Sequence, residues 1–179
     1  PAHPLRGGLA TFNERLIREY RRQGYEASIL TFSLQYPSMF FPGKTQFSSE
    51  PPPEDLPIEV KVNSINPLNW FSVGWQLKRL KPDLILVKYW MPFMAPCFGT
   101  ICRIARSNRH TRVISIIDNL IPHESRPGDQ ILSKYWIGAT DGCVAMSRSV
   151  MGELEMFDQQ KPKQYCPHPL YDNFGDQIS

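Results

Sequence analysis

The chain has 179 residues, of which 41% are hydrophobic and 21% charged; this is the size and composition of one ordinary globular domain. The formal net charge of +3 is too weakly basic to indicate a nucleic-acid partner. No apolar run reaches the roughly 18 residues of a membrane span, and Pro1-Ala2-His3-Pro4 has no signal-peptide features, so we expect a cytoplasmic protein. The four cysteines form no zinc-ligand pattern, which favours buried free thiols in a reducing compartment.

Apolar periodicity predicts helices that alternate with short strands along most of the chain. Gly24 ends the first helix and Ser147 is the N-cap of the last one. The expected helices are Leu9–Gln23, Leu68–Leu80, Pro92–Ser107, Asp129–Ile137 and Ser147–Phe157. The expected strands are Ala27–Phe32, Ile58–Val62, Asp83–Tyr89, Arg112–Ile117, Gly142–Met146 and Gln164–Cys166.

A proline-rich segment between Tyr36 and Pro57 interrupts this alternation. Loops of this length inside a domain are usually functional. Phe40 and Phe41 in this loop either contact an acceptor, as part of a lid, or pack the loop onto the core. The residues do not decide between these two roles.

Strands that alternate with helices predict a parallel sheet covered by helices on both faces, a Rossmann-like three-layer α/β sandwich. The first helix follows the loop Pro1–Gly8, where a doubly wound domain normally has a preceding strand in mid-sheet. We therefore expect a central strand, beside Leu84–Val87 or Ala27–Phe32, to come from residues upstream of Pro1 or, failing that, from a neighbouring chain. The third alternative is a rearranged sheet.

Ligands of such sheets bind beyond the carboxyl ends of the strands. Arg6-Gly7-Gly8 precedes the first helix, where paired glycines let backbone N–H groups approach an anion and Arg6 adds a cation. The alternative is a plain turn.

Polar side chains also follow a buried strand at Asp118-Asn119-Leu120-Ile121-Pro122-His123-Glu124. Such density favours a binding or catalytic site; the alternative is a capped turn with His123 and Glu124 in solvent. Because both loops are expected at the carboxyl edge of the sheet, one cleft there should be lined by Arg6, Gly7, Gly8, Asp118, Asn119, His123 and Glu124. Trp90 follows another buried strand and either stacks on a sugar or a lipid or packs in the core.

These blocks together resemble the N-terminal domain of GT-B-fold glycosyltransferases of the group 1, or family 4, type. The blocks that carry the resemblance are Pro4-x-x-Gly7-Gly8, Pro82-Asp83-Leu84-Ile85, Asp118-Asn119-x-x-Pro122-His123-Glu124, Ala139-Thr140-Asp141, Ser147 and His168-Pro169-Leu170-Tyr171-Asp172-Asn173-Phe174.

The resemblance implies that residues 1–179 are one acceptor-side domain and that residues 167–179 begin the connection to a C-terminal domain that binds the nucleotide-sugar. It implies a retaining sugar transfer to a glycan or a lipid-linked saccharide, without a divalent metal or other cofactor. Many relatives carry a histidine at the position of Asp118, which makes Asp118 and His123 the catalytic candidates. The implied donor-phosphate and acceptor contacts are Arg6, Gly7, Gly8, Asn119, Glu124 and Trp90.

Two other functions compete with this interpretation. One is a non-catalytic Rossmann-like binding or regulatory domain. The other is a nicotinamide-dependent enzyme, for which the required G-x-G-x-x-G pattern is absent. The basic clusters Arg15–Arg22 and Lys78–Lys81 are solvated helix faces, or they attract an anionic lipid surface, as in a peripheral contact with the inner face of a membrane, or a phosphate-bearing substrate.

Overall fold

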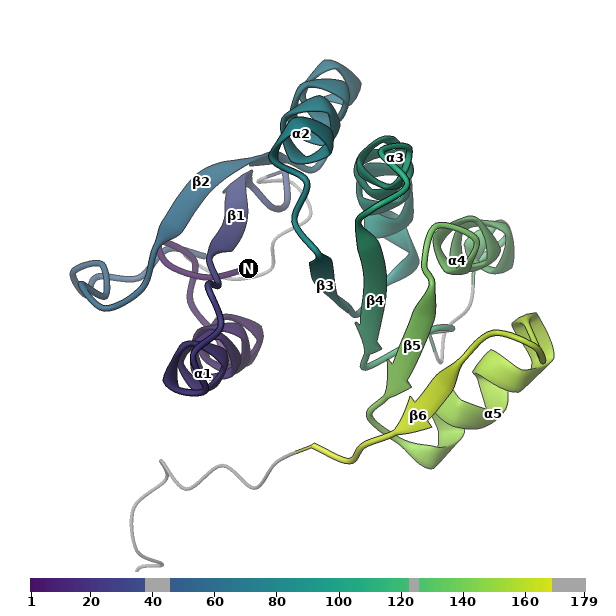
Figure 1. The fold of residues 1–179 in the computed structure, drawn as a ribbon. Coiled ribbons are helices and arrows are strands. Elements are labelled where there is room, and N and C mark those ends of the chain that lie inside the picture. Colours follow the sequence, from purple (N-terminus) through teal and green to yellow (C-terminus); the bar gives the residue numbers. More distant parts are fainter. Residues whose placement is uncertain (38–45, 123–125, 169–179) are drawn as a thin grey trace, which may run out of the picture.

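The computed structural model describes residues 1–37, 46–122 and 126–168. It confirms the expected alternation of helices and strands (Figure 1). The elements are α1 (Gly8–Arg22), β1 (Ile29–Leu34), β2 (Ile58–Asn63), α2 (Pro67–Leu80), β3 (Leu84–Tyr89), the 3-10 turn η2 (Pro92–Met94), α3 (Ala95–Arg106), β4 (Arg112–Ile117), α4 (Asp129–Ile137), β5 (Gly142–Ala145), α5 (Arg148–Phe157) and β6 (Lys163–Tyr165).

All paired strands of these elements run parallel, as the sequence predicts. β3, β4, β5 and β6 form one sheet in that order, and β1 pairs with β2 in another. In the part of the chain that the structure describes, no ladder joins β1 to β3, so the sheet divides where the sequence predicts an additional central strand. The source of that strand stays a prediction.

The helices cover both faces of the sheet, which makes the domain a three-layer sandwich. Figure 1 shows α2, α3 and α4 in a row along one face and α1 and α5 on the opposite side. Among residues 1–37, 46–122 and 126–168, no helix is both long and apolar enough to cross a membrane.

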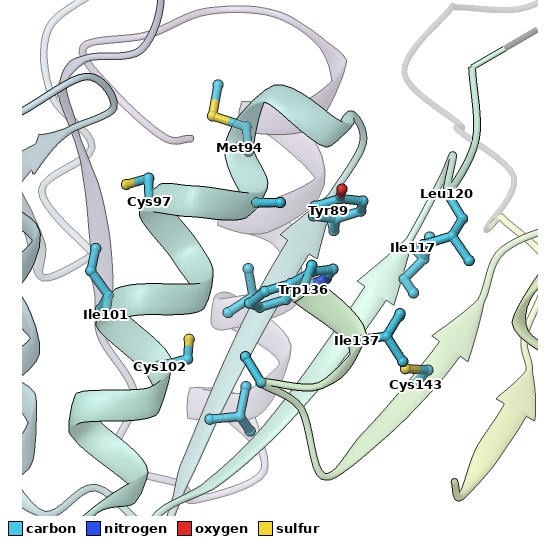
Figure 2. Packing of buried hydrophobic residues seen from close by; sticks show 14 of the residues in the cluster. Tyr89, Met94, Cys97, Ile101, Cys102, Ile117, Leu120, Trp136, Ile137 and Cys143 are labelled. Atoms are coloured by element: carbon cyan, nitrogen blue, oxygen red, sulfur yellow. The ribbon is translucent and has the colours of Figure 1, made fainter. Parts of the chain in front are cut away.

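The main core cluster joins strands β1 to β5 to the row of helices formed by α2, α3 and α4, and it also includes Val150 and Leu154 of α5. Tyr89 of β3 stacks on Trp136 of α4 with ring centroids 5.4 Å apart, and both side chains are fully buried (Figure 2). Cys97 and Cys102 of α3 and Cys143 of β5 are buried free thiols. The sequence-based expectation of free, buried cysteines is therefore confirmed for three of the four, whereas Cys166 is exposed.

α2 and α3 pack closely because Gly74 has no side chain. A Cβ atom built on Gly74 would lie 2.9 Å from Cβ of Ile104 in α3. The carbonyl of Lys78 also accepts a hydrogen bond of 3.4 Å from Asn108, just beyond α3. These contacts hold α2, the helix over the β1–β2 sheet, against α3, the helix over the β3–β6 sheet.

The helix expected over Pro92–Ser107 has two parts instead of one. Its first turn is η2, in which the N–H of Ala95 donates to the carbonyl of Pro92, three residues earlier. Pro96 has no N–H with which to continue a regular α-helical ladder from Pro92. The α-helix therefore begins only at Ala95.

Asp141, in the loop before β5, braces the opposite, amino-terminal edge of the sheet. Its carboxylate accepts hydrogen bonds from the guanidinium of Arg106 at 2.6 Å and from the backbone N–H of Val113 at 2.8 Å. Because these bonds tie α3, β4 and the start of β5 together, the Ala139-Thr140-Asp141 block has a structural role.

Candidate functional site

A buried ion pair marks the carboxyl edge of the sheet. Lys88 in β3 donates a hydrogen bond of 2.7 Å from Nζ to Oδ1 of Asp118, which directly follows β4. The Lys88 side chain is only 2% exposed and that of Asp118 17%. Sequence reasoning selected Asp118 and missed Lys88, although a cation inside an otherwise apolar strand was a signal that could have found it.

Phe12 of α1 covers this ion pair. The Lys88 ammonium lies 3.9 Å from the centre of the Phe12 ring, a distance typical of a cation–π contact. Burial lowers the pKa of Lys88 from its usual value of 10.5, and the hydrogen bond and charge of Asp118 oppose that shift. Lys88 therefore meets the carboxylate on one side and an aromatic face on the other, within a poorly hydrated environment.

His168 adds a third polar group to the cluster. Its Nε2 lies 3.1 Å from Oδ1 of Asp118, and its ring meets Phe12 edge-on at a centroid distance of 6.5 Å. His168 comes after β6, in the segment that the resemblance identifies as the start of the interdomain connection. The Lys88–Asp118–His168 cluster thus joins α1, β3, the end of β4 and the segment after β6.

The loop after β4 is held from several directions. The N–H of Asp118 donates to the carbonyl of Tyr89 at 3.0 Å. The hydroxyl of Ser133 in α4 donates to the carbonyl of Leu120 at 2.7 Å, and the N–H of Ile121 donates to the carboxylate of Glu153 in α5 at 3.1 Å. Leu120 itself is fully buried, so the loop is fixed to the core and to two helices.

The other candidates near Asp118 stand as follows. Asn119 is exposed at the sheet edge. His123 and Glu124 lie outside the residues that the structure describes. Ser147 is the N-cap of α5 and accepts a hydrogen bond of 3.2 Å from the N–H of Val150, as the sequence predicts.

The glycine pair forms an open N-terminus on α1. Gly7 is the N-cap residue, with φ of 112°, a conformation that favours glycine. A Cβ atom on Gly7 or Gly8 would meet no atom within 4 Å, and α1 has no side-chain cap and no acidic residue in its first turn. The helix dipole and its amino end are therefore accessible to an anion.

A cavity of about 220 Å³ lies beside this helix start. Arg6 and Gly7 line it, together with residues of α1 and of the segment 48–53. That segment is held in place by two backbone hydrogen bonds. The N–H of Arg6 donates to the backbone carbonyl of Gln46 at 3.1 Å, and the N–H of Ser48 donates to the carbonyl of Pro4 at 2.8 Å. The end of the long proline-rich loop therefore forms one wall of the cavity.

The two candidate regions meet through α1. Phe12, one turn beyond Gly8, contacts both Lys88 and His168, so the start of α1 lies near Asp118. Asp118 is not among the residues that line the cavity beside Arg6, and a single cleft containing both residues stays a prediction.

Phe40 and Phe41 of the long proline-rich loop lie outside the described residues, so the choice between their two roles stays open.

Trp90 belongs to an aromatic cluster. Its indole N–H donates to the hydroxyl of Tyr36 at 2.7 Å. Its ring meets Phe32 and Phe98 edge-on at centroid distances of 6.4 and 6.0 Å. These contacts agree with the packing role, and a direct contact with a sugar stays a prediction.

The arrangement offers a carboxylate that can accept hydrogen bonds from hydroxyl groups, beside a helix N-terminus that favours an anion. Across residues 1–37, 46–122 and 126–168, no three His, Cys, Asp or Glu side chains gather in a way that could hold a metal ion. The expectation that the reaction needs no metal is untested.

Comparison with known proteins agrees with this architecture. The family model described as Glycosyltransferase Family 4 matches residues 6–163. No curated protein is significantly similar to the chain. The match covers every element from α1 to α5, reaches the first residue of β6, and supports a Rossmann-like GT-B half-domain.

Proposed function

Because the chain belongs to glycosyltransferase family 4, we propose that it is the acceptor-side domain of a retaining glycosyltransferase. The enzyme transfers a sugar from a nucleotide-sugar to a glycan or a lipid-linked saccharide. The observation that carries the proposal is the Lys88–Asp118–His168 cluster at the carboxyl edge of the sheet, close to the uncapped start of α1.

In this proposal the two regions of the edge have different tasks. The N–H groups at Gly7 and Gly8 and the guanidinium of Arg6 receive the donor diphosphate, since a helix N-terminus favours phosphate. Asp118 accepts a hydrogen bond from a hydroxyl of the reacting sugar, in the position where many relatives have a histidine. Lys88 orients the Asp118 carboxylate through its hydrogen bond to Oδ1.

The remaining candidates surround these groups. Asn119, His123 and Glu124 are proposed to bind hydroxyl groups of donor or acceptor, and Trp90 to border the acceptor side. The nucleotide is bound mainly by the C-terminal domain, so the isolated chain binds nucleotides weakly and shows no turnover, because a half-site loses orientation as well as affinity. Neither a metal nor another cofactor takes part.

The test is an assay of the full-length protein against a panel of nucleotide-sugars, with and without EDTA, in which release of the nucleoside diphosphate is measured. NMR of the anomeric proton of the product establishes whether the configuration is retained. Asp118→Asn preserves the shape of the side chain and removes its charge, and should lower kcat at least about a hundredfold. Asp158→Asn, beyond the C-terminus of α5, is the matched control and should leave kcat unchanged.

Two results would contradict the proposal. If no nucleotide-sugar is consumed by a folded full-length protein, the domain is a binding or regulatory module instead. If Asp118→Asn retains wild-type kcat on a consumed donor, the protein is a transferase but Asp118 is not a catalytic residue.

A further inference from the structure

The outward face of α2 is unusually apolar. The exposed fractions of Leu68, Phe71 and Trp75 are 80%, 52% and 50%. Spacings of three and four residues place these side chains on one face of the helix. Val73 and Gly74 are buried, so α2 has an apolar surface toward solvent in addition to the one that it packs against the domain.

Basic side chains lie at the C-terminal end of this apolar face. Lys78, Arg79 and Lys81 follow Trp75 within six residues, and Nζ of Lys78 lies 4.5 Å from the centre of the Trp75 ring. The segment 60–82 contains no Asp or Glu. This surface therefore combines apolar and cationic side chains and contains no carboxylate that could neutralise the cations. We call it the α2 surface; it consists of Leu68, Phe71, Trp75, Lys78, Arg79 and Lys81.

We propose that the α2 surface binds an anionic lipid membrane, independently of the proposed catalytic function. A helix that lies in a membrane interface combines Trp, Phe and Leu on the buried side with Lys and Arg that reach the headgroups. Trp is enriched at the level of the headgroups because its ring is apolar and its N–H polar. Lys and Arg side chains extend along the apolar surface and keep their charges in the headgroup layer.

The charge distribution favours lipid over a second copy of the chain. In a dimer formed through α2, the basic end of one helix would need a counter-charge on the other helix. The segment 60–82 supplies no carboxylate, whereas an anionic leaflet supplies many phosphates. Each Lys or Arg near such a surface contributes about fivefold in affinity.

The experiment is co-sedimentation of the full-length protein with vesicles of pure phosphatidylcholine and with vesicles of equal parts phosphatidylcholine and phosphatidylglycerol. The wild type should bind the anionic vesicles and not the neutral ones, and added salt should weaken binding. The double variant Lys78→Glu/Arg79→Glu should lose at least about 25-fold in affinity. Trp75→Ser should lose about tenfold, because it removes apolar area from the interface.

Matched controls separate the α2 surface from net charge and hydrophobicity. Lys134→Glu changes an exposed lysine of α4, and Met156→Ser changes a methionine of α5 that is 75% exposed. Both controls should bind anionic vesicles as the wild type does. Lys78 is half-buried, and the other four substituted side chains are exposed. None belongs to the buried core, so far-UV circular dichroism should show the same fold for each variant.

Any of four results would overturn the proposal. The first is that the wild type does not bind anionic vesicles. The second is that the α2 variants bind as well as the wild type. The third is that the controls lose as much binding as the α2 variants do. A fourth is a dimer in analytical ultracentrifugation that Trp75→Ser dissociates while vesicle binding is absent, which would make this face an interface between two copies. Loss of transferase activity alone would not bear on the proposal, because vesicle binding is measured without substrate.

Discussion

Replacing Lys88 with Met tests whether the buried ion pair stabilises the carboxyl edge. Met fills most of the volume of the lysine stem but leaves the Asp118 carboxylate without its closest cation. Removing one partner of a buried ion pair typically costs about 3–5 kcal/mol. Asp118 is 17% exposed and keeps His168 at 3.1 Å, so we expect the lower part of that range, about 3–4 kcal/mol.

The measurement is urea unfolding of the wild type and of Lys88→Met, followed by far-UV circular dichroism. The variants Asp118→Asn and Lys88→Met/Asp118→Asn complete a double-mutant cycle, in which direct contact should give a coupling free energy of about 1–3 kcal/mol. Lys134→Met, at an exposed position of α4, is the control and should change stability by less than about 0.5 kcal/mol. A Lys88→Met protein as stable as this control, or a coupling free energy near zero, would show that the pair does not hold the edge.

The other predictions concern titration, glycine geometry and thiol access. Burial lowers the pKa of Lys88 in the folded state, so at pH values between that pKa and about 10.4 the unfolded state binds more protons than the folded state. In that pH range the unfolding free energy of the wild type should therefore rise with pH relative to that of Lys88→Met. Gly7→Ala should lower the unfolding free energy by about 1–3 kcal/mol because φ is 112°, whereas Gly8→Ala, with open space around its new methyl group, should not; equal stability of the two would refute this. Gly74→Ala should cost about 1–3 kcal/mol in urea unfolding, since its methyl group would lie 2.9 Å from α3. Mass spectrometry after alkylation of the native protein should find Cys166 modified and the three buried thiols, two of which have a pKa raised to about 12, protected until the protein unfolds.

Local sequence signals account for most of the fold. The apolar run of β3 and the periodic apolar residues of α1 predict strand and helix without any tertiary information. Gly24, with φ of 89°, and Ser147, whose hydroxyl caps α5, mark helix ends by chemistry that acts within a few residues. The boundary between η2 and α3 depends on the missing N–H of Pro96, and there the sequence pattern predicted one continuous helix instead of two parts.

The candidate site was predictable only in part because its contacts join distant residues. Asp118 follows a buried strand, which is a local signal, but its partner Lys88 lies 30 residues earlier. His168 belonged to a block that carried the family resemblance, yet nothing near it indicated a contact with Asp118. Such pairs depend on how β3, β4 and the segment after β6 come together, and periodicity contains no information about that.

The anchoring of the loop after β4 has a consequence for the thermodynamics of binding. Ordering a flexible backbone costs roughly 1–2 kcal/mol per residue in conformational entropy, and residues 118–121 are already held by Tyr89, Ser133 and Glu153. A ligand that reaches Asp118 therefore does not have to freeze this loop when it binds. Replacing Glu153 with Ala removes the acceptor for the N–H of Ile121 and would transfer part of that entropy cost to the binding step. Calorimetry would record a less favourable −TΔS of binding, although the ligand makes the same contacts.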